Sequence, residues 1–544
     1  MTSIFTHLPI LPVAIPLMAG AIMLLLGDAR RKSRLFLSIV SIAAQIYVAI
    51  LLFNMVTNSG NSPWAAGVGV YLLGDWPAPF GIVAVVDYLA VIMLLLTAVL
   101  GATTWIYSVA KWDRRGVHYH PLFQFLMMGL NGAFLTGDLF NLFVFFEVLL
   151  VASYGLMLHG SGRARVSAGL HYIAVNLVAS FLLLLALAII YALTGTLNMA
   201  DLAVRAGNLD VADRHIFEAG AALLGIAFLI KGAAWPLNFW LPSTYANACP
   251  PVAGMFAIMT KVGIYALLRI GSLLVPSGAP AAFSGEWMFA AGIATLVFAS
   301  IGILAAAQVE RQAGFGIIMS SGLLLAALGM PGVLLTGPAL FYMIVSVFAL
   351  GALFMLLDMI NRTQPFGGDV LAASQELFDL DDPEEPDTDD VIGIAIPGVM
   401  AFLGMSFFAC ALLIIGLPPL AGFVAKFSLL SAALKTSSGN LPGLHAWVFV
   451  ATVLTSGFAG LIALCRSGIR LFWSQDDSVT PRLRIIEAGP VALLILICMI
   501  LTIWAGPIMQ FMHDTAQYLD NPATYVNAVL KQNPMRGTTY GINP

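Results

Sequence analysis

The stretch LFNLFVFFEVLL, residues 139–150, places a single carboxylate, Glu147, among apolar side chains and one amide. In a helix that crosses a bilayer, Glu147 would lie near mid-depth. A charged side chain at the bilayer centre costs about 2.5–3.5 kcal/mol on insertion scales. Glu147 is therefore the first candidate functional residue, because a chain keeps such a group only where it is paired or where it transports a charge.

The composition indicates a membrane protein along the whole chain. Of the 544 residues, 60% are hydrophobic and only 10% are charged, whereas soluble domains carry about 25% charged residues. Apolar windows of about 20 residues, the length of a membrane-spanning helix, recur almost throughout. Basic residues follow the first apolar run, at 30–34, and do not precede it. This order predicts a first transmembrane helix and not a cleaved signal peptide.

The hydrophobic pattern predicts an all-α polytopic membrane protein with about fourteen transmembrane helices. The expected spans are 8–27, 35–56, 80–108, 121–137, 139–158, 169–193, 216–235, 251–275, 287–307, 314–331, 337–360, 394–434, 446–471 and 487–512. Basic residues favour the odd-numbered connections, as with Lys111, Arg114 and Arg115 in the third. These connections are expected to be cytoplasmic, with both termini outside.

The domain organisation follows from the same pattern. We expect N-terminal helices 1–3 at 1–120, helices 4–8 at 121–275, helices 9–13 at 287–471, and helix 14 with a tail at 487–544.

One connection, at 369–391, differs in composition from the rest of the chain. Its segment ELFDLDDPEEPDTDD (376–390) holds nine of the 28 acidic residues, and without them the net charge of −4 would become +5. A charged run with prolines is typical of a solvated cytoplasmic connection. The alternative is a docking surface or an antenna that attracts cations.

No motif for cofactor, metal or covalent chemistry is present. The four cysteines stand singly without CxxC spacing, and there is no Walker loop, dinucleotide glycine fingerprint or HExxH. We therefore expect no cofactor, no metal, no catalytic residues and no nucleic-acid partner. The sequence favours a secondary transporter over an enzyme.

Few ionisable residues lie deep within the predicted spans, and the main ones are Glu147, Lys231, Lys261 and Lys426. Buried membrane charges face the bundle interior or water, and they mark ion or proton routes. Lysine suits a relay because burial disfavours its charged form and a carboxylate favours it. The alternative for Glu147 is a structural ion pair, with Lys231 as its partner.

Two aspartates lie near the ends of spans. Asp87 is close to the start of the third span and Asp358 to the end of the eleventh. Charged side chains at such positions often extend to the headgroups. Asp87 is kept as a supporting polar residue.

Two predicted spans are interrupted beside a lysine. GAAWPLNFWLP (232–242) follows Lys231, and GLPPLAGFVA (416–425) precedes Lys426. Non-helical backbone at depth is tolerated only inside protein or beside water. Paired broken helices point to inverted repeats with a site near the midplane. Helices 7 and 12 are therefore expected to be broken, one in each five-helix half.

Several of these segments resemble a known family. GDLFNLFVFFEVLLVASYGL (137–156) resembles the fifth-helix signature of the D-type subunits of multisubunit Mrp-type sodium/proton antiporters. LIKGAAWPLNFWLP (229–242), TKVGIYALLR (260–269) and GLPPLAGFVAKF (416–427) look like later motifs of those proteins. The resemblance covers roughly residues 5–510. The superfamily is shared with antiporter-like membrane subunits of respiratory NADH dehydrogenase.

The resemblance implies a fourteen-helix subunit, with two inverted five-helix repeats, in a complex of several membrane subunits in the cell membrane. Glu147 matches the fifth-helix glutamate that pairs with a seventh-helix lysine, here Lys231. Lys261 matches the eighth-helix relay lysine, and Lys426 the lysine of the broken twelfth helix. Protons would pass along these residues in exchange for sodium.

The chain also departs from its relatives. Asn238 stands where relatives commonly have histidine, and the helix expected at 341–357 has Leu350 near a place often occupied by lysine. The step from the eighth to the twelfth helix would then need other polar groups and water. The residues that could supply them are Ser320, Ser321 and Ser346.

Two other classes of function stay open at this point. A proton-pumping membrane-arm subunit of a respiratory NADH dehydrogenase or a membrane-bound hydrogenase would look the same in this chain, since redox centres would lie in partner subunits. A scaffold without transport would tolerate neutral residues at the buried charges.

Overall fold

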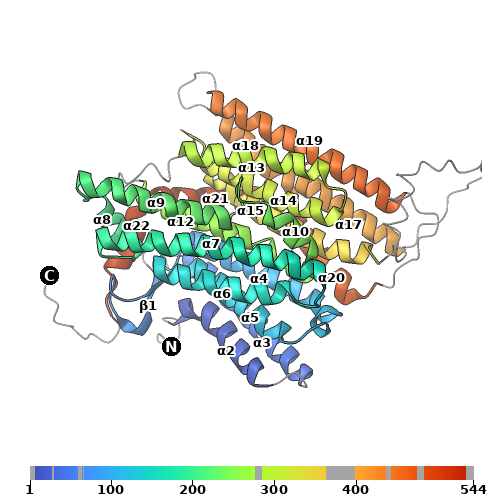
Figure 1. The fold of residues 1–544 in the computed structure, drawn as a ribbon, viewed down its shortest axis with the longest axis horizontal. Helices are drawn as coiled ribbons and strands as arrows, with labels where there is room; N and C mark the ends of the chain where they lie inside the picture. Colours follow the sequence, from blue (N-terminus) through green and yellow to red (C-terminus); the bar gives the residue numbers. More distant parts are fainter. Residues whose placement is uncertain are drawn as a thin grey trace, which may run out of the picture.

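The apolar windows of the sequence form a bundle of long helices in a computed structural model (Figure 1). The structure describes residues 7–26, 30–58, 64, 67–275, 285–331, 333–362, 398–435, 443–473 and 483–534. The acidic segment 376–390 and the connection 369–391 lie outside these residues. Twelve of the described helices are long and apolar enough to cross a membrane.

The described part of the chain is mostly helical, with one pair of short strands. In chain order they are η1 (Leu8–Ile10), α2 (Leu11–Leu25), α3 (Arg31–Thr57), β1 (Gly69–Leu72), η4 (Leu73–Asp75), β2 (Val83–Val86), α4 (Tyr88–Val109), η5 (Trp112–Arg114), α5 (Tyr119–Leu135), α6 (Leu139–Met157), α7 (Arg163–Thr194), α8 (Met199–Ala206), α9 (Val211–Lys231), α10 (Trp240–Asn247), α11 (Pro250–Phe256), α12 (Met259–Leu274), α13 (Gly285–Ala305), α14 (Val309–Leu328), α15 (Thr336–Ile360), α17 (Gly398–Ile415), α18 (Ala421–Leu434), α19 (Leu444–Phe472), α20 (Ile485–Ile503), α21 (Ala505–Asp520) and α22 (Pro522–Leu530).

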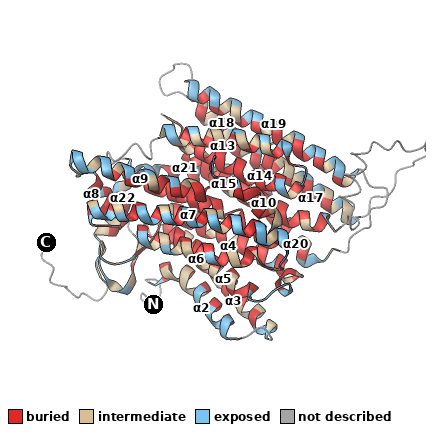
Figure 2. Cartoon of the chain, in the orientation of Figure 1, coloured by how far each residue is buried: buried red, intermediate tan, exposed pale blue. Residues whose placement is uncertain are grey.

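Helix α15 forms the centre of the bundle. Its apolar window is 100% buried, whereas that of α13 is 33% buried. Burial concentrates in the middle of the molecule, and exposed residues lie on the outer helices (Figure 2). Helix α15 packs against α11 and α14, which precede it in the chain, and against α17 and α18, which follow it. It therefore joins the two predicted halves.

The all-α prediction is wrong in one place. Residues 69–72 and 83–86 pair as an antiparallel hairpin, with Gly69 opposite Val86 and Leu72 opposite Val83. The predicted span 80–108 therefore becomes helical only at Tyr88. Three valines in VAVV (83–86) favour a strand over a helix, and Asp87 starts the helix by accepting the backbone N–H of Ala90 at 2.9 Å.

Two predicted spans leave the helical conformation beside a lysine. Helix α9 ends at Lys231 and α10 begins at Trp240, while α17 ends at Ile415 and α18 begins at Ala421. Each interruption contains prolines, which cannot donate a helical hydrogen bond. The last predicted span, 487–512, ends at Ile503 and a separate helix, α21, follows.

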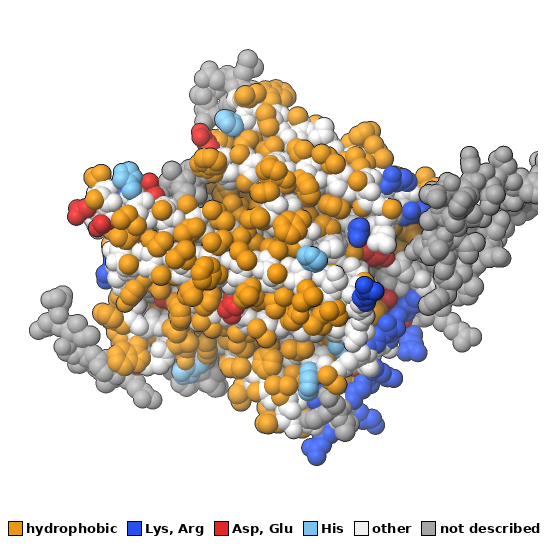
Figure 3. Space-filling model, viewed as in Figure 1, with side chains coloured by type: hydrophobic (Ala, Val, Ile, Leu, Met, Phe, Trp, Pro, Cys, Tyr) orange, Lys and Arg blue, Asp and Glu red, His pale blue; other side chains and the backbone are white. Residues whose placement is uncertain are grey.

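The outer surface of the bundle is apolar, as a membrane requires. Figure 3 shows hydrophobic side chains over most of the visible face, with Lys and Arg gathered at one end of the helices. Such an apolar belt is far larger than the patches of a soluble monomer. The polar connections therefore lie at the ends of the bundle, and the three candidate lysines are buried inside it.

Candidate functional site

Glu147 is half-buried on α6. Helix α6 starts at Asp138, whose side chain accepts the N–H of Asn141 at 2.9 Å. The Oε1 atom of Glu147 is buried and has no hydrogen-bond partner among the described residues. A buried carboxylate oxygen without a donor is costly, so Glu147 is a group whose charge must be met by water or by a nearby cation.

Lys231 lies at the last position of α9 and is 8% exposed. Its Nζ atom is 3.4 Å from Ser180 Oγ on α7 and lies 4.7 Å from the centre of the Phe146 ring. Among the described residues, Glu147 and Lys231 form no direct ion pair. The expected pair is therefore not a direct contact in this structure.

A close approach of two backbones brings α12 to the end of α9. A Cβ atom at Gly263 would lie 2.6 Å from both Phe228 O and Gly232 N, so any other residue would force the helices apart. Because Gly263 is two residues after Lys261, this contact also fixes the position of Lys261 relative to Lys231.

A small cavity lies between Lys231 and the start of α12. Its volume is about 30 Å³, and its polar lining includes Lys231, Asn176 and Thr260. One water needs roughly 10–15 Å³ on this measure and two to four polar partners. The cavity has room for one or two waters, and its lining includes Thr260, the residue next to Lys261.

Lys261 is 0% exposed and is surrounded by hydroxyl groups. Its Nζ atom donates to Ser320 Oγ at 2.5 Å, to Thr260 Oγ1 at 3.2 Å and to Ser321 Oγ at 3.3 Å. Ser320 in turn donates to the carbonyl of Ile317 at 2.9 Å. The structure thus brings the predicted Ser320 and Ser321, on α14, to the predicted Lys261.

Lys426 lies on α18 at the second interruption and is 6% exposed. Its Nζ atom donates to the carbonyl of Ile415 at 2.7 Å and to that of Ile414 at 3.1 Å. Both carbonyls belong to the end of α17. The negative end of a helix dipole favours a cation.

Two predicted supporting residues are buried away from these contacts. Ser346, on α15, donates to the carbonyl of Met343 in its own helix at 3.0 Å. Asn238 is 0% exposed, and within the described part of the chain neither polar atom of its amide has a hydrogen-bond partner. Leu350 is also buried on α15.

Comparison with known proteins places these features in a family. Residues 136–455 match the family described as NADH:quinone oxidoreductase/Mrp antiporter, TM. The chain belongs to this family. It is 46% identical over 537 residues to the D subunit of a probable K(+)/H(+) antiporter of Rhizobium meliloti (strain 1021), covering 97% of this chain and 98% of that protein. It is 30% identical over 539 residues to the D subunit of the Na(+)/H(+) antiporter of Alkalihalophilus pseudofirmus, covering 97% and 100%.

A solved structure agrees with this assignment. A chain of the Mrp complex from Dietzia sp. DQ12-45-1b superposes with a TM-score of 0.79 at 26% identity, covering 96% of this chain and 99% of that chain. The predicted resemblance to the D-type antiporter subunits is confirmed. This family member is a multi-pass membrane protein whose relatives are transporter components and subunits of larger membrane complexes.

Several polar partners of the site were not predicted from the sequence. Asn176 and Ser180 lie one helical turn apart in the otherwise apolar stretch 173–190 of α7, a spacing that could have marked them. Thr260 directly precedes Lys261 and was not predicted either. These hydroxyl and amide groups have no charge, so they are visible only as polar interruptions of an apolar run.

A buried ion pair fixes the other end of α12. Arg269 Nη1 lies 2.6 Å from Asp87 Oδ2, and Nη2 lies 2.7 Å from Oδ1. Both side chains are almost fully buried, and the guanidinium lies 5.1 Å from the Tyr525 ring. Asp87 therefore does not extend to the headgroups. It joins α4 to α12 two turns beyond Lys261, which the sequence could not reveal because 182 positions separate the partners.

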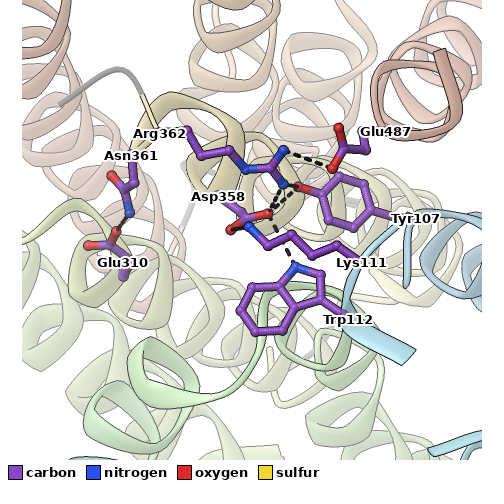
Figure 4. Close-up of polar contacts among 8 residues, drawn as sticks. All are labelled: Tyr107, Lys111, Trp112, Glu310, Asp358, Asn361, Arg362 and Glu487. Carbon is purple, nitrogen blue, oxygen red and sulfur yellow. Dashed lines mark hydrogen bonds and ion pairs between the residues drawn. The ribbon is translucent and has the colours of Figure 1, made fainter. Parts of the chain in front are cut away.

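Asp358 also has partners, at the opposite end of the bundle (Figure 4). Its Oδ2 atom accepts from Tyr107 Oη at 2.7 Å, from Trp112 Nε1 at 3.2 Å and from Arg362 at 2.5 Å. Arg362 also donates to Glu487 at 2.8 Å. This cluster ties the third, eleventh and thirteenth connections to one another.

Each acidic side chain of this cluster lies beside a basic one. Lys111 Nζ lies 3.5 Å from Asp358 Oδ1. Burial lowers the pKa of Lys111, and Asp358 opposes that effect only in part. Burial also acts to lower the pKa of Arg362, but Asp358 outweighs it and the pKa is raised. In Figure 4, Glu310 and Asn361 form a separate contact beside the cluster.

Further contacts join odd-numbered connections. Arg31 Nη2 lies 2.6 Å from Asp113 Oδ2, which links the first connection to the third. Burial acts to raise the pKa of Asp113, but the neighbouring His120 and Arg31 outweigh it and the pKa is lowered. His159 Nε2 is 2.8 Å from the carbonyl of Trp112, and burial lowers the pKa of His159. These connections therefore meet at one end of the bundle.

Proposed function

We propose that this chain is a proton-translocating membrane subunit of a multisubunit monovalent cation/proton antiporter. The observation that carries the proposal is Lys261, an entirely buried cation held by three hydroxyl groups and by no carboxylate in the described chain. A structural lysine would be paired or would reach the surface. Lys261 can lose its proton without breaking an ion pair, as a relay requires.

The proton path begins at Glu147 and Lys231. Glu147 would collect a proton, and a change in its charge would alter the stability of the Lys231 ammonium beside it. Waters in the cavity next to Lys231 would pass the proton toward Lys261. Each elementary charge that crosses the membrane exchanges about 2.3 kcal/mol per 100 mV, so the membrane potential can drive these steps.

The path continues from Lys261 toward Lys426. Ser320 and Ser321 would hand the proton on, with water and Ser346 bridging to the twelfth helix. Asp87 and Asn238 would support the path without carrying the proton. Lys426 would be the last carrier before the opposite side.

The architecture that we propose has fourteen transmembrane helices. Adding α5 and α9 to the twelve apolar helices gives this number, with α18 as the second part of the broken twelfth helix. Helices 4–8 (121–275) and 9–13 (287–471) would be inverted repeats, because each half has a break beside a lysine. Residues 1–120 and 487–544 would flank them.

The protein would lie in the cell membrane with other antiporter subunits. The basic, odd-numbered connections would face the cytoplasm and both termini the outside. Sodium is the cation expected from the sequence resemblance. The 46% identical relative, however, is named for K(+)/H(+) antiport and the 30% identical relative for Na(+)/H(+) antiport. Both ions are therefore compared in the test.

The test is Glu147→Gln in the complete complex. The change removes the charge and nearly preserves the shape, so assembly should persist while cation-induced proton movement in everted vesicles falls to background. Sodium and potassium are added separately. The control is Glu218→Gln, on α9, whose side chain is 37% exposed. Wild-type proton movement by Glu147→Gln at normal complex levels would contradict the proposal.

A further inference from the structure

The end of α17 has two carbonyl groups that the helix itself cannot satisfy. In an α-helix the carbonyl of residue i accepts the N–H of residue i+4. For Ile414 and Ile415 these positions are Pro418 and Pro419, and proline has no N–H. The sequence GLPP thus leaves two adjacent carbonyl oxygens free inside the protein.

In the described part of the chain, the side-chain donor to these oxygens is Lys426, with Nζ at 3.1 Å from Ile414 O and 2.7 Å from Ile415 O. Among the residues that the structure describes, no carboxylate is recorded within ion-pair distance of Lys426. The charge of the ammonium is therefore balanced by carbonyl dipoles and the end of a half-helix. Lys426 acts here as a monovalent cation tethered to the chain.

Two glycines allow the backbone at the end of α17 to lie close to the start of α18. Gly416 has φ +83°, and a Cβ atom there would lie 2.6 Å from Lys426 Cδ. A Cβ atom at Gly422 would overlap the carbonyl oxygen of Leu413. Three consecutive carbonyls of α17 thus face the start of α18, and two glycines make the approach sterically feasible.

We propose that the carbonyls of Ile414 and Ile415 form a binding site for a dehydrated monovalent cation, and that Lys426 and the transported cation occupy it in turn. Half-helix ends and unwound carbonyls are suited to coordinating such ions. Divalent cations would require carboxylates, which this site lacks among the described residues. The inference rests on the proposed function and specifies where proton and cation compete.

The exchange conserves charge at the site. The Nζ–H bond of Lys426 breaks, its electron pair stays on nitrogen, and the proton leaves along the proton path. The neutral side chain then moves off the carbonyls, and one Na⁺ or K⁺ takes the position of the ammonium. One positive charge replaces another, so the carbonyl dipoles stay balanced throughout.

The experiment measures cation binding and does not depend on transport. Lys426→Ala is made in the complete complex, which is purified in choline chloride and titrated with sodium or potassium chloride at constant ionic strength. On addition of the cation, the denaturation temperature of Lys426→Ala should rise in a saturable way by about 2–4 °C. That of the wild type, whose site is filled by lysine, should rise by less than about 1 °C. Direct binding of radioactive sodium or rubidium should rise in parallel.

Lys261→Ala is the matched control, because it removes an equally buried lysine whose partners are hydroxyls and not helix-end carbonyls. It should respond like the wild type. Lys426→Gln keeps a neutral donor for the carbonyls, so it is the second variant to use if Lys426→Ala does not assemble. It should bind the cation more weakly than Lys426→Ala. Recovery of the alanine variant in sodium or potassium but not in choline would also support the site.

The proposal is overturned if neither Lys426 variant binds a monovalent cation beyond the wild type, or if Lys261→Ala gains the same response. Lys426 would then only cap the end of α17. The proposed proton path is tested separately by Glu147→Gln, so the two can fail independently.

Discussion

The hydroxyl cage of Lys261 makes a quantitative prediction about the pH dependence of transport. Ser320→Ala removes the shortest of the three contacts, at 2.5 Å. A hydrogen bond to a charged group contributes about 1.5–3 kcal/mol, and about 1.4 kcal/mol corresponds to one pH unit. Because the lost bond favoured the ammonium, a higher proton concentration is needed to load the site. The pH of half-maximal antiport should therefore fall by about 1–2 units.

The assay is cation-induced collapse of a proton gradient in everted vesicles over a neutral-to-alkaline pH series, with the amount of complex measured in each preparation. Ser321→Ala removes a longer contact, at 3.3 Å, and should shift the profile less. Ser300→Ala is the control, because that hydroxyl donates to the carbonyl of Leu296 in its own helix, α13, and lies outside the proposed path. An unchanged profile for Ser320→Ala, or an equal shift for Ser300→Ala, would refute the reasoning.

Three further predictions concern features outside the proposed path. Arg269→Met leaves the buried Asp87 without its cationic partner and should cost about 3–5 kcal/mol of stability. Thermal denaturation should show that stability recovers when Asp87→Leu is added, and equal loss in the single and double variants would contradict this account. Burial lowers the pKa of His159 in the folded protein. As the pH falls below about 6.5, His159 therefore gains a proton in the unfolded chain before it does so in the folded protein. Stability should then decline toward acid, and less steeply in His159→Gln; parallel denaturation curves across pH would contradict the assignment. Replacing 379–390 by a Gly/Ser linker should leave antiport nearly intact, whereas a large rise in the half-saturating sodium concentration would support the antenna.

The helical bundle was predictable because its signals are local. Apolar windows mark the helices, and the prolines after Lys231 and before Lys426 mark the places where helices end. The hairpin at 69–86 was missed because its second strand, VAVV, is as apolar as the helix that follows. Hydropathy alone cannot separate a buried strand from the first turns of a buried helix.

The buried charges were predictable, but most of their partners were not. Lysine and glutamate stand out in an apolar sequence because their burial is costly. Which hydroxyl, carbonyl or ring meets each charge depends on helix rotation and on contacts between distant segments. Lys231 thus lies over Phe146 and near Ser180 without touching Glu147, and Asp87 meets Arg269.

The most direct test of the proton path is Lys261→Ala in the complete complex, compared with Lys435→Ala, which removes an exposed lysine at the end of α18. Proton movement in everted vesicles is measured on addition of sodium or potassium, at equal amounts of complex. The account predicts that Lys435→Ala behaves as the wild type and that Lys261→Ala moves no protons with either cation. Wild-type proton movement by Lys261→Ala would contradict it, because no proton could then have passed through that buried amine.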